Sequence, residues 1–319
     1  MTGSPRARRW IVRLGVSLGS LVLLLALLEV VWRVRTSLTF GPTTNPHYVI
    51  HDDRLGWRYE PGATARHATD DFDVEIHIDS CGFRRVVPVP EGTTGAPVVL
   101  LGDSLAFGWG VPEGQTLADR LQALVKHPVR NLAVSGYATD QECLLLESDG
   151  LALAPTWVVV VVCENDVAEV LRDRVYGKGK PRFVVSDNHL SLTNVPVPYS
   201  RLERISVLYR SLRKSLDPSD PLPPEFVAPQ GRELVRRILG KMASDVARAG
   251  SALLIAHEGL SAWLAEVPGA ETLDVAEALS ATEQSEGQVH FDHDPHWNAR
   301  GHAAVARAIQ RCLGGRLMR

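Results

Sequence analysis

The sequence has 319 residues, of which 45% are hydrophobic, and this length allows one large globular domain with additions or at most two small domains. The formal net charge of −3 is unevenly distributed, because residues 1–38 contain six arginines and one acid, Glu29, whereas the rest contains 28 basic and 36 acidic residues. A domain with this excess of acidic groups repels a phosphate backbone, which excludes nucleic acid as a partner.

A nearly unbroken apolar segment runs from Leu14 to Trp32. About 20 apolar residues in a helix match the roughly 30 Å hydrocarbon core of a bilayer. The length of the segment, and the lack of a small-x-small motif after it, favour an uncleaved signal anchor over the alternative, a cleaved signal peptide. Glu29 lies near one end, where a carboxylate can reach the membrane interface.

The flanking charges predict how this segment is oriented. Four arginines precede it and two follow it. By the positive-inside rule, the N-terminus stays in the cytoplasm and the rest of the chain lies outside it. Residues 1–38 are therefore expected to form a cytoplasmic stub and a single transmembrane anchor.

Residues 39–95 are expected to form a linker and a small β-rich region ahead of the main domain. The part covering 39–55 is polar and contains proline, which indicates the linker. After it, short runs alternate in polarity. In the run DVEIHIDS, Val74, Ile76 and Ile78 share one face, as in a strand with one buried side.

The main domain is expected over residues 96–319, where apolar runs of strand length alternate with helical periodicity. Strands are predicted at 97–101, 129–134, 157–163 and 252–256, and helices at 116–125, 138–149, 231–248 and from Asn298 to just before Gly314 and Gly315. Thr116 and Asp119 have the spacing of a capping box at one helix start. Strands alternating with helices form a parallel sheet that helices cover on both faces, an α/β fold.

An insertion over residues 174–230 interrupts this alternation. It contains the turn signal Asp187–Asn188, which predicts a hairpin, then a short helix and the proline-rich run DPSDPLPPEF. An insertion between core elements is either a lid that selects the substrate or a surface segment without a role in the activity, and the sequence favours neither.

The cysteines give no sign of a metal centre. They are Cys81, Cys143, Cys163 and Cys312, with neither a CxxC pair nor zinc-type spacing. We interpret them as buried free thiols, and one or two disulfides in an oxidising compartment are the alternative.

The first motif that indicates chemistry is Gly102-Asp103-Ser104-Leu105, directly after the predicted strand 97–101. Ligands of open α/β sheets bind beyond the carboxyl ends of the strands, so Ser104 is expected at that edge. A serine hydroxyl becomes a nucleophile when a base lies within hydrogen-bond reach and donors are ready for the oxyanion. Three later segments follow core elements, are expected at the same edge and carry a candidate donor or base. They are 131–137 with Gly136, 163–166 with Asn165, and 292–298 with His296.

The order of these motifs resembles the conserved blocks of SGNH/GDSL hydrolases: the GDS motif, then Gly136, then an Asn-Asp pair that begins at Asn165, and last an acid–histidine pair. The resemblance covers residues 97–313 apart from the insertion. The runs GDSLAFGWGVPEGQT, SCGFR and LGWRYEPG resemble membrane-tethered bacterial members. The resemblance implies a flavodoxin-like three-layer α/β/α sandwich and no cofactor. It also implies that Ser104 is the nucleophile and His296 the general base. The amides of Ser104 and Gly136 and the Asn165 side chain would form the oxyanion hole.

The acid that supports His296 departs from the family pattern. The common pattern has an aspartate three residues before the histidine, and here that residue is His293. The D-x-H-W-N order resembles SGNH-type acetyltransferases of exopolysaccharide pathways, in which the acid stands two residues before the histidine. Asp294 is therefore the predicted partner, with Asp292 as second choice. Cys163 stands where many members have glycine, and we expect it to alter packing near the oxyanion hole.

Other polar residues near these motifs are expected to have structural roles. Asp103 orders its loop, Asp166 caps the helix that follows it, and His302 is a partly exposed surface residue. The acids and histidines at 290–296 are interpreted as catalytic and not metal-binding, because neighbours in one extended loop converge poorly on one ion.

Three functions are compatible with these residues. The first is an esterase that cleaves small acyl esters, such as O-acetyl groups on a carbohydrate, through an acyl-enzyme on Ser104. The second is an O-acyltransferase that acts on envelope or exported glycans with the same residues. The third, a non-catalytic envelope scaffold, is disfavoured because every catalytic residue type is present. The expected partners are an ester substrate and the membrane.

Overall fold

A computed structural model describes residues 5–40, 48–87, 90–216, 224–265 and 267–317. Contacts divide the chain into two units, of which one, the helical unit, contains residues 1–42 and 200–218. The other, the sheet unit, contains residues 43–199 and 219–319, so the chain passes between the units three times. Parts of the expected linker (41–47) and of the proline-rich run (217–223) lie outside the described residues.

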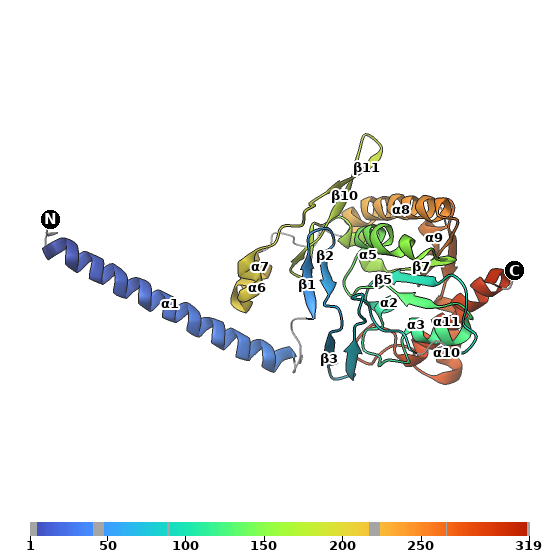
Figure 1. Cartoon of the computed structure of the whole chain (residues 1–319), viewed down its shortest axis with the longest axis horizontal. Coiled ribbons are helices and arrows are strands. Elements are labelled where there is room, and N and C mark those ends of the chain that lie inside the picture. Colours follow the sequence, from blue (N-terminus) through green and yellow to red (C-terminus); the bar gives the residue numbers. More distant parts are fainter. Residues whose placement is uncertain (1–4, 41–47, 88–89, 217–223, 266, 318–319) are drawn as a thin grey trace. The chain divides into compact units, whose positions relative to one another are not determined.

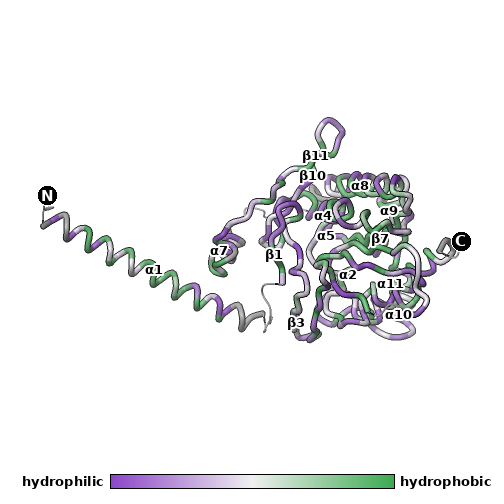
Figure 2. The backbone as a smooth tube through the Cα atoms, in the orientation of Figure 1, coloured by the Kyte–Doolittle hydropathy of each residue, from purple (hydrophilic) through white to green (hydrophobic). Residues whose placement is uncertain are grey.

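The helical unit consists of α1 (Pro5–Phe40), α6 (Arg201–Ile205) and α7 (Val207–Leu216). Residues Arg9–Arg35 of α1 are long and apolar enough to cross a membrane, and Figure 2 shows hydrophobic residues along this helix. Side chains in this stretch are largely exposed in the isolated chain. α7 packs against α1.

The sheet unit is built on five parallel strands in the order β13-β12-β7-β5-β6. These are β5 (Val98–Gly102), β6 (Val129–Asn131), β7 (Trp157–Val162), β12 (Ala252–His257) and β13 (Glu271–Asp274). Every residue of β5 and β7 is buried, which explains their continuous apolar sequences. Because all five strands are parallel, their carboxyl ends meet at one edge.

Helices cover both faces of this sheet. One layer contains α3 (Leu117–Leu124), α10 (Ala276–Glu286) and α11 (Ala299–Leu317), and the other α4 (Thr139–Leu145), α5 (Glu164–Glu169) and α8 (Pro224–Arg248), as Figure 1 shows. Two short helices, α2 (Ser104–Phe107) and α9 (Ser261–Leu264), follow β5 and β12. The predicted three-layer α/β/α architecture is confirmed. The capping box of Thr116 and Asp119 is present at the start of α3.

The lead-in region forms two antiparallel hairpins. Their strands are β1 (Val49–Asp52), β2 (Gly56–Tyr59), β3 (Thr64–Ala68) and β4 (Asp73–His77). Val74, Ile76 and Ile78 are buried, as their alternation predicts. The expectation of a linker up to residue 55 was wrong, because β1 already pairs with β2 from Val49.

The insertion begins with two more hairpins. They are β8 (Arg174–Val175) with β9 (Lys178–Gly179), and β10 (Arg182–Ser186) with β11 (His189–Thr193). Asp187 and Asn188 have φ angles of 48° and 65°, as the two central residues of a type I′ hairpin turn require. The rest of the insertion, α6 and α7, belongs to the helical unit.

Several elements differ from the sequence-based expectation. β13 was missed because Leu273 is its only strongly apolar residue. α8 begins at Pro224 and not near residue 231. α11 continues through Gly314 and Gly315, where the helix was expected to end. Two glycines cost about 1 kcal/mol each in a helix, which the packing of the buried Leu313 side chain helps to offset.

Two glycines of α8 allow a matched test of this packing. A Cβ on Gly231 would lie 1.8 Å from the carbonyl oxygen of Val167 in α5, whereas a Cβ on Gly240 would meet nothing within 4 Å. We expect Gly240→Ala to raise the free energy of unfolding by up to about 1 kcal/mol through helix propensity. Gly231→Ala should lower it by about 1–3 kcal/mol, because the two helices must move apart. Thermal or chemical denaturation measures both, and equal effects would contradict the close approach of α5 and α8.

Candidate active site

Ser104 lies at the carboxyl edge of the sheet, immediately after β5. Gly102 ends the strand with a φ of 145°, and a Cβ there would lie 2.7 Å from the Ala106 Cβ. The chain can therefore turn tightly into α2, whose first residue is Ser104. Asp103 caps this helix by accepting a hydrogen bond of 2.9 Å from the Leu105 backbone N–H, so it orders the loop as expected.

His296 reaches Ser104 from the loop before α11. Its Nε2 lies 2.7 Å from the Ser104 Oγ, and its Nδ1 is hydrogen-bonded to the Asp294 Oδ1. A carboxylate only accepts hydrogen bonds, so Nδ1 carries the proton and Nε2 presents a lone pair to the serine hydroxyl. The same Asp294 oxygen accepts a hydrogen bond of 2.9 Å from the His296 backbone N–H, which holds the carboxylate in place.

Asp294 is kept ionised by its surroundings. Burial alone would raise the pKa of its carboxyl, but hydrogen bonds from the His296 backbone and ring, and from Trp109, lower the pKa below its usual range. The Trp109 ring also lies beside the His296 ring, with 6.0 Å between the ring centroids. Asp292 is exposed, and no contact between it and His296 is present in the described part of the chain.

The residue at the usual family position of the acid, His293, has a different partner. Its backbone N–H and its Nδ1 lie 3.1 Å and 2.9 Å from carboxylate oxygens of Asp71, just before β4 in the lead-in region. Phe291 in the same loop packs against Phe72, with 5.1 Å between ring centroids. The lead-in region therefore supports the loop that carries His296.

The three residues expected at an oxyanion hole follow β5, β6 and β7. Within the described part of the chain, neither the Ser104 nor the Gly136 backbone N–H has a hydrogen-bond partner, so both can donate to a ligand. The Asn165 side chain lies in the first turn of α5, and its Nδ2 donates to the Asp103 Oδ2 at 3.3 Å. Gly136 has a φ of 80°, a conformation that favours glycine.

A tyrosine that sequence reasoning missed lies against this group. Tyr176, in the β8–β9 turn, would be 3.1 Å from a Cβ on Gly136. Its hydroxyl donates to the Glu169 Oε1 at 2.5 Å, and both side chains hydrogen-bond Asn165. No periodicity marks Tyr176; the only signal is the Tyr176–Gly177 turn that joins two very short strands.

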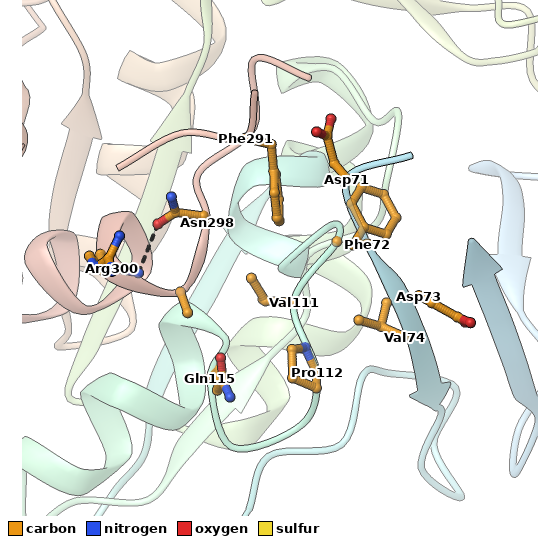
Figure 3. Close-up of a pocket in the computed structure, with 12 residues that line it drawn as sticks. Asp71, Phe72, Asp73, Val74, Val111, Pro112, Gln115, Phe291, Asn298 and Arg300 are labelled. Carbon is orange, nitrogen blue, oxygen red and sulfur yellow. Dashed lines mark hydrogen bonds between the residues drawn. The ribbon is translucent and has the colours of Figure 1, made fainter. Parts of the chain in front are cut away.

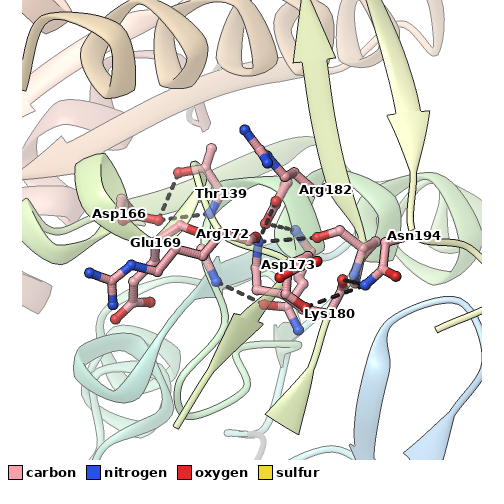
Figure 4. A network of polar contacts seen from close by, with 12 residues as sticks. Thr139, Asp166, Glu169, Arg172, Asp173, Lys180, Arg182 and Asn194 are labelled. Atoms are coloured by element: carbon pink, nitrogen blue, oxygen red, sulfur yellow. Dashed lines mark hydrogen bonds and ion pairs between the residues drawn. The ribbon is translucent and has the colours of Figure 1, made fainter. Parts of the chain in front are cut away.

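A buried ion pair attaches these hairpins to α4, and Lys180 of this pair is part of the polar network in Figure 4. Lys180 is fully buried, and its Nζ lies 2.5 Å from the Asp140 Oδ2. The same Nζ donates to the carbonyl oxygens of Glu169, Arg172 and Pro181. Asn194 donates to the Lys180 carbonyl oxygen at 2.6 Å. Since a buried charge without its partner costs about 3–5 kcal/mol, this pair holds the Tyr176 turn beside the site.

Four carboxyl groups are buried around the same edge. Burial, and then repulsion among the group, raise the pKa of Asp166 to about 8, and burial raises that of Glu169 to about 7. The pKa values of Glu142 and Asp103 are also raised, chiefly by burial. Neither carboxyl oxygen of Glu142 has a hydrogen-bond partner among the described residues. Asp166 accepts hydrogen bonds from the Cys163 and Thr139 backbones, so it caps α5 as expected.

A cavity of about 460 Å³ lies next to the lead-in region (Figure 3). Its walls include Phe72 just before β4, Val111 in the loop after α2, Phe291 in the loop before α11 and Arg300 at the start of α11. Neither the serine nor the histidine described above lines it. We therefore assign it no part in binding the reacting ester.

The expectations about the exposure of His302 and of the cysteines need correction. His302 is buried, with 1% of its surface exposed, and burial lowers its pKa to about 3. It was expected at the surface because the sequence gives only its position in the helix. The sequence does not indicate that its ring packs against Trp297. Cys143 and Cys163 are buried as expected, whereas Cys81 is exposed. Among the described residues, no group of three or more acids, histidines or cysteines could hold a metal ion.

Comparisons with known proteins gave one family and several solved structures. The model of the GDSL-like lipase/acylhydrolase family matches residues 100–304. An α/β hydrolase from the metagenome of Lake Arreo, Spain, is 15% identical, with 70% of this chain and 96% of that chain covered and a TM-score of 0.43. An acetylxylan esterase from Geobacillus stearothermophilus is 14% identical, with 72% and 99% covered and a TM-score of 0.42. A search of curated proteins gave no match.

The buried carboxyl groups predict a pH-dependent stability. Their pKa values are higher in the folded chain than in the unfolded chain, so folding is favoured at low pH and this contribution is lost as the pH rises through about 7 to 8. Glu142→Gln removes one such group. We expect the melting temperature of this variant, relative to the parent, to rise between about pH 5 and about pH 9. The exposed Glu277→Gln controls for the loss of one charge, and a constant difference for Glu142→Gln would contradict the assignment.

Proposed function

Since the chain belongs to the GDSL-like lipase/acylhydrolase family and is an ester-bond hydrolase, we propose that it is a serine esterase that removes small acyl groups from a carbohydrate. The observation that carries the proposal is the hydrogen-bonded series from Asp294 through His296 to the Ser104 Oγ. The three side chains come from two distant parts of the chain, and their order matches that of a nucleophile, a base and an orienting acid.

In the proposed mechanism, the Ser104 Oγ attacks the ester carbonyl while the His296 Nε2 takes the hydroxyl proton. The resulting imidazolium is stabilised by the ionised Asp294. Collapse of the tetrahedral intermediate breaks the ester C–O bond, and His296 returns the proton to the leaving alcohol. A water molecule, deprotonated by His296, then attacks the acyl-enzyme and releases the carboxylic acid.

We assign the oxyanion hole to the Ser104 and Gly136 backbone N–H groups and the Asn165 side chain. The support is that both N–H groups have no protein partner in the described part of the chain, and that the Asn165 amide follows β7 at the same edge of the sheet. Asp103 holds the Asn165 side chain by accepting a hydrogen bond from its amide. Donors that are already oriented stabilise the developing negative charge without reorganisation.

Two aromatic rings favour a small acyl group. Tyr176 closes the space beside Gly136, and Trp109 stands beside the His296 ring. A long acyl chain would have to displace one of them, whereas an acetyl group would not. Trp109 is partly exposed, and we propose that its ring contacts the sugar that carries the acyl group.

We further propose that α1 anchors the enzyme in a membrane, with the sheet unit outside the cytoplasm. The apolar span Arg9–Arg35 supports the anchor, and the excess of arginine before the span supports this orientation. Residues 96–319 would then be the hydrolase domain and 39–95 its lead-in. A protease added to intact cells should degrade the sheet unit if the orientation is correct.

Acyl transfer to a glycan is the second candidate function. The observation that favours it is the acid two residues before the histidine, since Asp294 and not Asp292 contacts His296. The same acyl-enzyme would then be attacked by a sugar hydroxyl in place of water. Incubation with an acetylated donor and an acceptor glycan separates the two: free acetate supports hydrolysis, and acetylated acceptor supports transfer.

The two flanking aspartates allow a matched test of the proposed triad. Asp294→Asn should lower kcat/KM for p-nitrophenyl acetate by roughly 10³–10⁴, because the imidazole would lose its tautomer and its counter-charge. Asp292→Asn removes the same charge from an exposed residue and should change kcat/KM by less than about twofold. Ser104→Ala should abolish labelling by a fluorophosphonate. Equal losses in the two aspartate variants would argue against Asp294 as the orienting acid.

A second test concerns the oxyanion hole. Asn165→Ala should lower kcat by about 10²–10³ and change KM much less, because the amide acts on the transition state. Asn188→Ala, in the β10–β11 turn, is the control for loss of an asparagine. Steady-state kinetics with unaltered circular dichroism measures both. A loss confined to KM would instead assign Asn165 to ground-state binding.

A further inference from the structure

The acid in the apolar segment has partners within the helical unit. The Glu29 carboxylate accepts hydrogen bonds from the Ser206 Oγ at 2.7 Å, from the Val207 backbone N–H at 2.8 Å and from the Leu208 backbone N–H at 3.1 Å. Arg33, one turn further along α1, forms an ion pair with Glu29 at 2.8 Å. The carboxylate thus caps the start of α7, whose first N–H groups have no partner inside that helix.

Two further hydrogen bonds join the same helices. The Trp32 Nε1 donates to the Ser211 Oγ at 2.6 Å, one turn into α7, and the Arg33 Nη2 donates to the Ile205 carbonyl oxygen at 2.7 Å. The α1 residues that form these hydrogen bonds, Glu29, Trp32 and Arg33, lie within five positions of one another. A short part of the anchor therefore holds a segment of the insertion that is more than 170 residues away in the sequence.

α7 has an apolar face and a basic face. Leu208 and Leu212 are one turn apart and share a face with Tyr209 close by, while Arg210 lies on the opposite face. Arg213 lies at the border of the two faces and forms an ion pair with Glu203 of α6 at 3.2 Å. Leu212 is 53% exposed, as is Leu202 in α6, and Ile205 is 63% exposed. A basic helix with exposed leucine and isoleucine is typical of helices that lie on a membrane surface.

The position along α1 of the hydrogen bonds to α7 agrees with such a surface. Glu29 stands six residues before Arg35, the end of the apolar span. At 1.5 Å per residue this is about 9 Å, and interfacial helices bury their apolar faces by about 5–10 Å. Trp32 is a residue type enriched at this depth.

We propose that α6 and α7 lie in the headgroup region of a phospholipid bilayer beside α1, with Leu202, Ile205 and Leu212 in contact with acyl chains and Arg210 toward the water and the lipid phosphates. The inference rests on the proposed membrane span of α1. Glu29 is then retained in the apolar segment because it fixes the depth and direction of α7 at the surface. Part of the insertion is a second membrane contact of the enzyme.

Site-specific fluorescence tests this proposal with the full chain in vesicles of phosphatidylcholine and phosphatidylglycerol. Cys81→Ser and Cys312→Ser leave only the buried Cys143 and Cys163. A nitrobenzoxadiazole label is then attached to one added cysteine, either Leu212→Cys or Arg210→Cys on the opposite face. A third label at Val22 reports insertion of α1. Quenching by lipids with a nitroxide on the acyl chain should be several-fold stronger at position 212 than at position 210, and strong at position 22.

The outcomes separate the two proposals. Strong quenching at position 22 with equal quenching at 212 and 210 overturns the surface contact of α7 and leaves the anchor intact; protection of 212 from both lipid quenchers and aqueous iodide would assign its face to a protein partner. No quenching at position 22 overturns the anchor and the surface contact together.

Glu29 variants test whether the hydrogen bonds from α7 to Glu29 fix the position of α7 at the membrane surface. Glu29→Gln keeps an oxygen that accepts from the start of α7 and should retain the difference between positions 212 and 210. Glu29→Ala has no acceptor and should abolish the difference, while quenching at position 22 persists because the span has become more apolar. Retention of the difference in Glu29→Ala would overturn the role of Glu29.

Discussion

The imidazole of His296 is hydrogen-bonded on both sides, and each bond depends on a different part of the fold. Ser104 is held by the tight turn after β5, where only glycine can occupy position 102 without a clash. Asp294 is held by the backbone of the loop that it shares with His296. That loop is in turn tied to the lead-in region through the contact between His293 and Asp71. The parallel sheet supplies one half of the geometry and the N-terminal hairpins steady the other.

The charges around this edge show how the fold accommodates an acidic site. Lys180 is paired with Asp140, and it belongs to the insertion and not to the sheet. Glu142, Asp166 and Glu169 have raised pKa values instead of basic partners, because burial favours their neutral forms. The insertion hairpins therefore do two things: they supply the cation that pairs with a buried acid, and they bring Tyr176 against Gly136. A surface segment without a structural role would do neither.

The sequence predicted the central sheet well, because β5, β7 and β12 are continuous apolar runs that can only be buried. It missed β13, whose single leucine carries little hydrophobic signal, and β1, which pairs through backbone groups that composition does not reveal. The family blocks predicted the residues around Ser104 and placed Asp294 ahead of Asp292, and the side-chain geometry has Asp294 hydrogen-bonded to His296. Asp71, Tyr176 and Glu29 contact partners far away in the chain, and no local pattern reports such contacts.

The chain crosses between the helical unit and the sheet unit three times, with α6 and α7 between the second and third crossings. A single proteolytic nick before β1 would sever the covalent link to α1 but leave the sheet unit joined to α6 and α7, which are hydrogen-bonded to Glu29, Trp32 and Arg33. Release of the sheet unit from α1 would therefore require that these hydrogen bonds be broken as well. An attachment of this kind tolerates damage that would release a protein tethered by one flexible stalk.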